Sequence, residues 1–475
     1  MNEALKQRLE TTRRALGQYD QDHLLRFADR LDDKSLERLL DQIDTFDLEL
    51  IRDLSEQLVF KDVVVHLDKL TPPEVVTLPK TPEEEEARHK AHERGEEAIR
   101  AGKVAALVVA GGQGTRLGFD GPKGCYPAGP VSGKTLFRQQ AEKIRSAARR
   151  YGVAIPWYVM TSETNRESTV ATFRENGFFG LDEDDVYFFT QGMMPSVDRR
   201  GQMLLDAPDH VFTSPNGHGG TFKALVDSGA LDDMARRGVE HISYFQVDNV
   251  LIKIIDPVFI GNHAAADSEM SSKGCRKTDP FERVGNFAIR EDKLHVVEYS
   301  DLPDEMARQR TGEGELLFAM GSIGIHVIDR EFARRMGTGR YALPYHRADK
   351  KVPYLDAEGN LVEPDEKNAV KFEMFIFDAL PRARNPIVLE VDRAEEFSPI
   401  KNADGPDSPD TARRDLTRQA LRWLASAGVD VPDEKSAEEF TIEIGPLFAR
   451  DAGELAGKVD ANLTVHDRLL LDEEQ

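Results

Sequence analysis

The stretch of sequence that decides the fold reads Leu107-Val-Val-Ala-Gly-Gly-Gln-Gly-Thr-Arg-Leu-Gly-Phe-Asp-Gly-Pro-Lys123. It begins inside a continuous apolar run from Val104 to Ala110, which leads directly into glycines. An apolar run of this length is typical of a strand buried in a parallel sheet. Because glycine lets the backbone approach a ligand and point N–H groups at phosphate oxygens, the sequence predicts a phosphate-binding loop here.

Side chains within this loop favour the same prediction over a purely structural turn. Thr115 adds a hydroxyl group, and Arg116 and Lys123 place positive charge beside the glycines. Polyphosphate binding needs such local charge here, because the chain as a whole is strongly acidic.

Two other phosphate-binding motifs fit less well. Gly112-Gln-Gly114 could begin a dinucleotide fingerprint, but the next glycine, Gly118, is one residue late, and no acidic residue closes a second strand at the usual distance of about 20 residues. The segment from Ala128 to Thr135 resembles a loosened P-loop, but the preceding Lys123-Gly-Cys-Tyr-Pro cannot form a central strand. We expect Lys134 and Thr135 to open the next helix instead.

Strands and helices alternate on either side of the loop. Further strands are expected at Ile155–Met160 and Ile242–Val247, and a helix is expected at Leu136–Tyr151, between the first strand and the strand at Ile155–Met160. This order predicts an α/β domain with a mostly parallel sheet.

The region before the first strand reads as helical. Apolar residues recur at three- and four-residue spacing between Leu24 and Ile43, and a helix is expected to begin after Thr81, which forms a capping box with Glu84. We therefore expect a helical N-terminal region at 1–102, a central catalytic domain at 103–404 and a small α+β domain at 405–475.

Composition restricts the partners and the compartment. The net charge of −23 disfavours nucleic acid and anionic lipid as partners, and no stretch has the roughly 20 uncharged apolar residues of a membrane helix. The N-terminus lacks the apolar segment of a signal peptide, and Cys125 and Cys275 give no disulfide framework. We expect a cytoplasmic protein.

Four polar residues outside the loop are candidates for chemistry. Asp248 ends an apolar strand, where a carboxylate can hold Mg²⁺ beside phosphates, although an aspartate in a strand-end turn is commoner. His218 lies in the tight turn Pro215-Asn-Gly-His-Gly-Gly. Lys371 and Lys401 stand in apolar, aromatic surroundings, where an anion contact and an ordinary surface lysine are equally compatible with the pattern.

These pieces together resemble the signature of the eukaryotic-type UDP-sugar pyrophosphorylases, and within them most closely the UDP-N-acetylhexosamine pyrophosphorylases. The glycine loop carries the resemblance, and further matches follow it in the same order. They are Gln191-Gly-Met-Met-Pro, Asn216-Gly-His-Gly-Gly, Val247-Asp-Asn, Val296-Val-Glu-Tyr, Lys371-Phe-Glu and Glu396-Phe-Ser-Pro-Ile-Lys-Asn, spanning roughly residues 100 to 405.

The resemblance implies a Rossmann-like nucleotide-diphospho-sugar transferase fold and transfer of a uridylyl group from UTP to a sugar 1-phosphate. It also implies roles for particular residues. Ala110, Gly111, Gly112, Gly114, Thr115, Arg116 and Lys123 would hold the UTP phosphates, Gln191 and Gly217 the uracil, Asp248 the Mg²⁺ ion, Gly285, Glu298 and Ser322 the sugar, and Lys371 and Lys401 phosphates.

Two residues depart from the N-acetylhexosamine pattern, which has Asn at both positions. They are His218, for which the UDP-glucose and broad-specificity enzymes of the family also have His, and Ser322. A glucose or galactose 1-phosphate therefore stays open as the acceptor. A non-catalytic UDP-sugar sensor on the same fold is the alternative from another class, which retention of Lys123, Asp248 and Lys401 disfavours.

Overall fold

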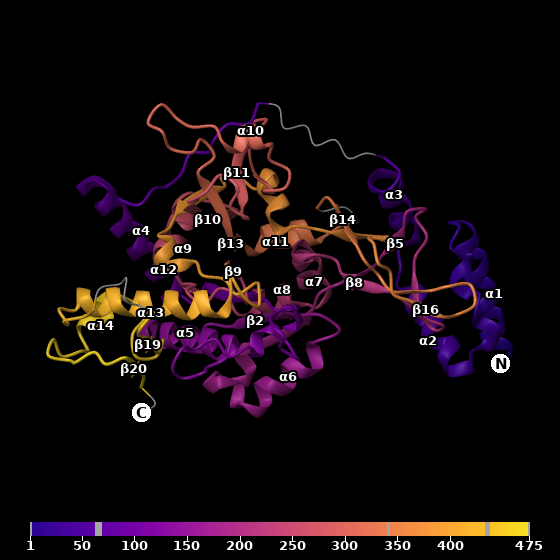
Figure 1. Cartoon of the computed structure of the whole chain (residues 1–475), viewed down its shortest axis with the longest axis horizontal. Helices are drawn as coiled ribbons and strands as arrows, with labels where there is room; N and C mark the ends of the chain where they lie inside the picture. Colours follow the sequence, from indigo (N-terminus) through magenta and orange to yellow (C-terminus); the bar gives the residue numbers. More distant parts are fainter. Residues whose placement is uncertain (1, 62–68, 340–342, 433–437, 474–475) are drawn as a thin grey trace. The chain divides into compact units, whose positions relative to one another are not determined.

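The computed structural model describes residues 2–61, 69–339, 343–432 and 438–473 (Figure 1). The chain forms two compact units that are interleaved along the sequence. The smaller unit contains 1–66, 191–220 and 341–378, and the larger unit contains 67–190, 221–340 and 379–475. The expected borders at 102/103 and 404/405 stay a prediction, because packing groups distant segments of the chain rather than consecutive ones.

The larger unit is built on a nine-stranded sheet with the order β12-β11-β13-β9-β1-β2-β3, in which β10 also pairs with β13 and β18 pairs with β10. Neighbours in β9-β1-β2-β3 are parallel, whereas β13 runs antiparallel to β9 and β11. Its strands are β1 (Val104–Val109), β2 (Trp157–Thr161), β3 (Val186–Thr190), β9 (His241–Gln246), β10 (Met270–Arg276), β11 (Gly285–Arg290), β12 (Lys293–Val297), β13 (Met320–Asp329) and β18 (Ile387–Glu390).

Helices cover both faces of this sheet, which confirms the α/β class. Alternate residues of β1, such as Ala106 and Val108, pack in one core with α5 and α9, while Tyr158 of β2 donates a hydrogen bond to Asp233 of α8 at 2.7 Å. The helices of the larger unit are α4 (Pro82–Arg100), α5 (Leu136–Tyr151), α6 (Arg166–Glu175), α7 (Thr221–Asp227), α8 (Ala230–Arg236), α9 (Pro257–Ala265), α10 (Asp304–Ala307), α11 (Arg330–Gly337), α12 (Arg393–Glu396), α13 (Pro409–Ser426) and α14 (Ala452–Ala456).

Several local predictions are confirmed. The apolar run from Val104 forms β1, the helix expected at Leu136–Tyr151 is α5, and the capping box between Thr81 and Glu84 begins α4. Within the C-terminal part of the larger unit, α13 packs against the short parallel pair β19 (Thr441–Ile444) and β20 (Arg468–Leu471).

The smaller unit has its own core, formed by its helices and short strands. Leu36, Leu39 and Leu40 of α2 pack in one cluster with Val197 and Phe372. Its elements are α1 (Glu3–Gly17), α2 (Asp33–Asp44), α3 (Leu48–Leu58), β4 (Met193–Pro195), β5 (Val197–Asp198), β6 (Leu205–Ala207), β7 (His210–Val211), β8 (Thr213–Pro215), β14 (His346–Lys350), β15 (Tyr354–Leu355), β16 (Leu361–Val362) and β17 (Ala369–Glu373).

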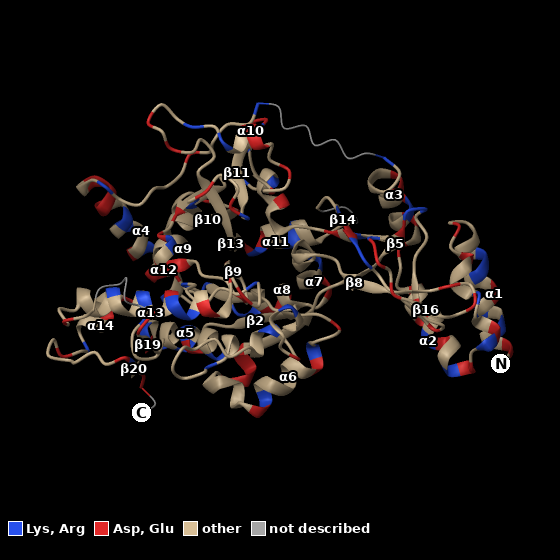
Figure 2. Ribbon diagram, viewed as in Figure 1, with Lys and Arg blue, Asp and Glu red and all other residues tan. Residues whose placement is uncertain are grey.

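Charged residues of both signs are interspersed along the helices, as on α1 and α4, rather than sorted by sign (Figure 2). This distribution is typical of solvated helix surfaces. No helix within the described residues is long and apolar enough to cross a membrane.

Candidate functional site

The glycine loop follows β1, and its carbonyl groups are anchored by polar residues at the end of β2. The Asn165 side-chain amide donates to the Ala110 carbonyl at 2.8 Å, and the Ser162 hydroxyl donates to the Gly111 carbonyl at 2.8 Å. Among the described residues, the N–H groups of Gly111 and Gly112 find no acceptor. The loop is therefore fixed through hydrogen bonds to its carbonyl groups, and the N–H groups of Gly111 and Gly112 stay available to an anion.

Space around the loop differs sharply between two of its glycines. A Cβ atom at Gly114 would lie 2.7 Å from the Phe119 ring, so this position is closed by the fold itself. A Cβ atom at Gly112 would meet nothing within 4 Å. Gly112 therefore faces open space, as expected of a surface that receives a ligand. Thr115 and Arg116, which follow, are exposed on the same loop.

Lys123 and Asp248 are brought together from positions 125 residues apart. The Lys123 Nζ atom lies 3.0 Å from Asp248 Oδ2, and the two side chains are only 16% and 13% exposed. Asp248 stands two residues beyond the end of β9, and Lys123 begins the short turn that closes the glycine loop. The loop and the expected metal-binding carboxylate thus share one end of the sheet, as the parallel order β9-β1 requires.

The segment that carries Asp248 is fastened to the segment that carries Lys401. The Ile400 N–H donates to the Asp248 carbonyl at 3.0 Å. The Asn249 side chain donates to the Glu396 carbonyl at 2.7 Å and accepts from the Ser398 N–H at 3.0 Å. These hydrogen bonds hold the backbone of Lys401 close to that of Asp248. The Nζ atom of Lys401 lies 5.7 Å from the centre of the Phe397 ring.

A buried ion-pair cluster underneath these segments went unrecognised in the sequence. Lys273 of β10 is 0% exposed and contacts Asp256 at 2.6 Å and also Glu396. Burial alone would raise the pKa of Asp256, but the Lys273 ammonium more than offsets this and lowers the pKa to about 2. The cluster ties β10 to the segments that carry Asp248 and Lys401. A lysine inside the strand-like run Met270–Arg276 was the only signal for it.

The residues expected to contact the sugar lie together, Gly285 and Ser322 on the paired strands β11 and β13 and Glu298 directly after β12. Gly285 of β11 pairs with Ser322 of β13, and a Cβ atom at Gly285 would lie 3.7 Å from Glu298 Oε1. The register of β13 against β9 also places Gly324 beside Gln246, so Ser322 and Asp248 follow at the same end of the sheet. The larger unit thus gathers the expected phosphate, metal and sugar residues at one edge.

Gln191, Gly217 and His218 lie together in the smaller unit. The Gln191 side-chain amide donates to the Gly217 carbonyl at 2.6 Å. Gly217 has φ of +86°, and a Cβ atom there would lie 2.3 Å from the Met374 carbonyl oxygen, so only glycine fits. The conformation of the turn that carries Gly217 is therefore restricted by the hydrogen bond from Gln191 and by the close approach of Met374.

His218 is held as a neutral imidazole. Its Nδ1 atom accepts the Ile376 N–H at 3.2 Å, and its ring stacks on Phe375 with centres 5.4 Å apart. Burial lowers the pKa of His218 to about 4, so the ring is uncharged at neutral pH. In the same unit Lys371 of β17 pairs with Glu373 at 2.8 Å.

The surroundings of Lys134 exclude the P-loop alternative. Lys134 is buried between Glu142, at 2.8 Å, and Asp472. Thr135 caps α5 by accepting the Arg138 N–H at 3.2 Å. As expected, Lys134 and Thr135 open the helix rather than bind phosphate.

Asp248 is the one carboxylate that the sequence analysis assigned to a metal. Within the described ranges, no cluster of three or more His, Cys, Asp or Glu residues could enclose an ion. Mg²⁺ is commonly bound by one or two carboxylates together with substrate phosphates rather than by an all-protein cage. A lone Asp248 beside the glycine loop fits that donor set.

Known proteins resemble this chain over most of its length. Residues 54–408 match the family model described as UTP–glucose-1-phosphate uridylyltransferase. A human UDP-N-acetylhexosamine pyrophosphorylase-like protein 1 is 39% identical, covering 90% of this chain and 88% of its own. The UDP-N-acetylglucosamine pyrophosphorylase of Saccharomyces cerevisiae is 40% identical, covering 71% and 73%. The crystal structure of the Trypanosoma brucei uridine diphosphate N-acetylglucosamine pyrophosphorylase superposes with a TM-score of 0.81 at 26% identity, covering 98% of this chain and 99% of that one.

Proposed function

Because the chain belongs to the UTP–glucose-1-phosphate uridylyltransferase family, we propose that it makes UDP-N-acetylglucosamine and pyrophosphate from UTP and N-acetylglucosamine 1-phosphate. The chain is a nucleotidyltransferase. The observation that carries the proposal is the contact between Lys123 and Asp248 beside a loop in which the N–H groups of Gly111 and Gly112 have no acceptor among the described residues.

The reaction needs positioning and charge neutralisation more than proton transfer. A phosphate oxygen of the sugar 1-phosphate attacks the α-phosphorus of UTP, and the bond from that phosphorus to the bridging oxygen breaks as pyrophosphate leaves in line. The attacking phosphate is already ionised near neutral pH, so no general base is required. The catalytic groups must instead reduce the repulsion between two anions.

Each candidate residue of the larger unit has a role in this scheme. The N–H groups of Gly111 and Gly112 would bind the UTP phosphates, and Arg116 and Lys123 would stabilise the charge that develops on pyrophosphate. Lys401 would contact a phosphate from the neighbouring segment. Gly285, Glu298 and Ser322 would line the sugar.

Asp248 would hold a magnesium ion. Bound there, the ion would offset the repulsion between the carboxylate and the phosphates and would withdraw charge from the α-phosphoryl group. Lys123 already neutralises Asp248 in part, which keeps the carboxylate compatible with an incoming polyanion.

Roles in the smaller unit follow the family resemblance. Gln191 and Gly217 would contact uracil, His218 would be a neutral substrate-binding group, and Lys371 would bind phosphate. The two free cysteines, Cys125 and Cys275, accord with the cytoplasmic location that we propose.

Glucose 1-phosphate is the second candidate acceptor, because Ser322 and His218 stand where the N-acetylhexosamine enzymes have Asn. The test is pyrophosphate release from UTP and Mg²⁺ with a panel of sugar 1-phosphates. We expect the highest kcat/KM with N-acetylglucosamine 1-phosphate. Preference for glucose or galactose 1-phosphate would reassign the acceptor, and folded protein that binds UTP without turnover on any sugar would favour a sensor.

A further inference from the structure

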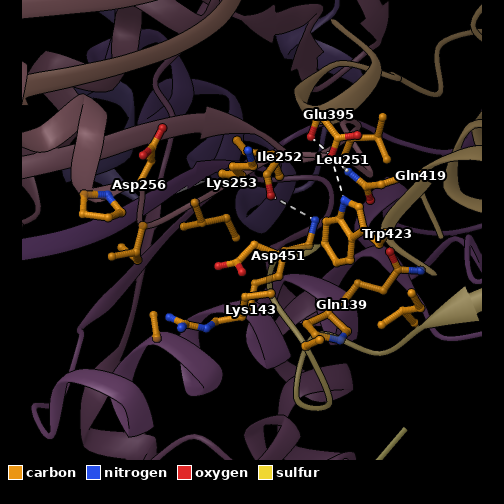
Figure 3. Close-up of a pocket in the computed structure, with 18 of the residues that line it drawn as sticks. Gln139, Lys143, Leu251, Ile252, Lys253, Asp256, Glu395, Gln419, Trp423 and Asp451 are labelled. Atoms are coloured by element: carbon orange, nitrogen blue, oxygen red, sulfur yellow. Dashed lines mark hydrogen bonds between the residues drawn. The ribbon is translucent and has the colours of Figure 1, made fainter. Parts of the chain in front are cut away.

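The larger unit contains a second cavity, away from the glycine loop, of about 270 Å³ (Figure 3). It is enclosed by α4, α5, α13, the segment 250–258 that continues from Asp248, and the segment 443–451 of the C-terminal part. Neither the loop residues 110–116 nor Lys123 line it. Its volume is near the lower end of the range for small-molecule pockets.

One wall of the cavity is apolar and rigid. Trp423 of α13 stands at this wall, and its Nε1 atom donates to Glu395 Oε2 at 2.9 Å, which fixes the orientation of the indole ring (Figure 3). Leu251 and Ile252 line the cavity from the segment that follows Asp248. A flat or compact apolar group would lose water on entering here and would be bound by contact with these side chains.

The acidic residues of the lining are already engaged by groups of the protein. Asp256 is neutralised by Lys273, and Glu395 contacts Arg422 at 2.9 Å. Glu443 accepts from the N–H groups of residues 131 and 132, and Asp451 accepts the Glu454 N–H at 2.8 Å. Cationic side chains thus offset the charges of Asp256 and Glu395, and N–H donors occupy carboxylate oxygens of Glu443 and Asp451.

Two basic residues of the lining are not matched in this way. Lys143 of α5 donates to the carbonyls of Val250 and Ile252, at 2.6 Å and 3.0 Å, and Arg88 of α4 also lines the cavity. Among the described residues neither forms an ion pair with a carboxylate. Burial lowers the pKa of Lys143 to about 7, because the charge of Glu396 only partly offsets desolvation and does not act as a directly paired counter-ion. An anion in the cavity would supply that counter-ion.

We propose that this cavity is a second binding site, separate from the nucleotide site, for a small organic anion with an apolar or aromatic body. The apolar group packs against Trp423 and Leu251, and the anionic group pairs with Lys143 and Arg88. This inference does not depend on which sugar the enzyme uses.

The position of Lys143 links the cavity to the catalytic segment. Gln140 and Lys143 lie on one face of α5, and Gln140 donates to the Val247 carbonyl at 2.9 Å. These two side chains thus hold the backbone immediately before and after Asp248. An anion that draws the Lys143 ammonium away from the Val250 and Ile252 carbonyls changes the support of Asp248, so occupancy of the cavity alters turnover.

Ligand-observed ¹⁹F NMR tests the site without relying on turnover. The probe is 4-(trifluoromethyl)benzoate, and 4-(trifluoromethyl)benzamide is its uncharged match. We expect the protein to broaden the benzoate resonance at least fivefold more than that of the benzamide, and saturating UTP to leave the broadening in place. Equal broadening of the two probes, or complete displacement by UTP, would overturn the proposal.

Variants locate the anion within the cavity. Lys143→Met is expected to reduce the benzoate broadening to the benzamide level, and Arg88→Met, on a more exposed helix, to weaken it several-fold. Lys223→Met, at an exposed lysine of α7 paired with Asp227, is the matched control and should bind as the wild type does. Unchanged binding by folded Lys143→Met or Arg88→Met protein would exclude this anion site.

Turnover tests the link to Asp248. Saturating benzoate probe is expected to change kcat or the KM for UTP at least twofold in the wild type, and Arg88→Met should need a several-fold higher probe concentration for the same change. Binding without any change in either constant would overturn the coupling.

Discussion

The ammonium of Lys123 lies 3.0 Å from the carboxylate of Asp248, although 125 residues separate them along the chain. Both side chains are largely buried, at 16% and 13% exposure, so the pair forms part of the floor of the candidate site rather than a surface contact. The contact joins the residue expected to stabilise departing pyrophosphate to the residue expected to bind metal.

Lys123→Ala should lower kcat by about a hundredfold, because one charged donor to the transition state is worth on the order of 3 kcal/mol. The measurement is steady-state pyrophosphate release, with thermal unfolding to establish that the protein is folded. Lys223→Ala removes an exposed, ion-paired lysine and should leave kcat unchanged. Wild-type turnover by Lys123→Ala would remove this residue from the mechanism.

Asp248→Asn should weaken the activation of turnover by Mg²⁺. We expect chelation by EDTA to abolish activity in the wild type, and the variant to need at least tenfold more Mg²⁺ for half-maximal rate, because a neutral amide is a poorer ligand than a carboxylate. Rates measured across a Mg²⁺ titration provide the comparison. Asp227→Asn, at an exposed aspartate, is the matched control, and identical titration curves for all three proteins would contradict the assignment.

Gly112→Ala should weaken UTP binding without changing the stability of the fold. A Cβ atom at this position meets no protein atom within 4 Å, so the free energy of unfolding should change by less than about 0.5 kcal/mol. The methyl group would nevertheless occupy the surface offered to phosphate, and we expect the KM for UTP to rise about tenfold, the equivalent of 1.4 kcal/mol. Gly17→Ala, which also meets nothing within 4 Å, should leave both quantities unchanged. A normal KM in Gly112→Ala would place the phosphates elsewhere.

Ser322→Asn should increase the preference for N-acetylglucosamine 1-phosphate over glucose 1-phosphate. Ser322 pairs with Gly285 across β11 and β13, so a longer amide there can reach the sugar that these strands are expected to line. One added hydrogen bond, worth about 1 kcal/mol, would raise the ratio of the two kcat/KM values roughly fivefold. A ratio that does not move, in protein that unfolds as the wild type does, would argue against a sugar contact at this position.

His218 should make the protein less stable in acid. The pKa is near 6.5 in the unfolded chain and about 4 in the folded protein, so between these values the unfolded state binds the extra proton. Stability is therefore lost as the pH falls from about 6.5 to 4, by about 1–3 kcal/mol from this residue. Urea unfolding at several pH values should show a shallower loss in His218→Asn.

His89 is the control for this pH dependence. Its imidazole is 65% exposed on α4, so His89→Asn should follow the wild type at every pH. Parallel curves for His218→Asn and the wild type would mean that the imidazole is not held neutral in the folded protein.

Local features of the fold could be predicted because they depend on neighbouring residues. The apolar run of β1, the Thr81–Glu84 capping box and the helix from Leu136 each reflect a preference expressed within one or two turns of chain. The glycine loop belongs to the same class, since Gly111, Gly112, Gly114 and Arg116 all lie within six consecutive positions of the sequence.

The partners of buried charges could not be predicted in this way. Nothing near Lys273 in the sequence indicates that Asp256 and Glu396 neutralise it, and nothing near Lys143 indicates a cavity. Lys134 shows the reverse case, because its motif suggests phosphate while the fold surrounds it with Glu142 and Asp472.

The sequence by itself determined the strand-loop-helix unit and the family, and it predicted which residues bind phosphate. Only the tertiary structure decided that Lys123 meets Asp248, that Lys273 ties together the segments bearing Asp248 and Lys401, and that His218 is neutral. The physical reason is the difference in sequence range between the two kinds of interaction. Backbone preferences and caps act over a few residues, whereas desolvation and the pairing of buried charges depend on which distant segments exclude water from one another.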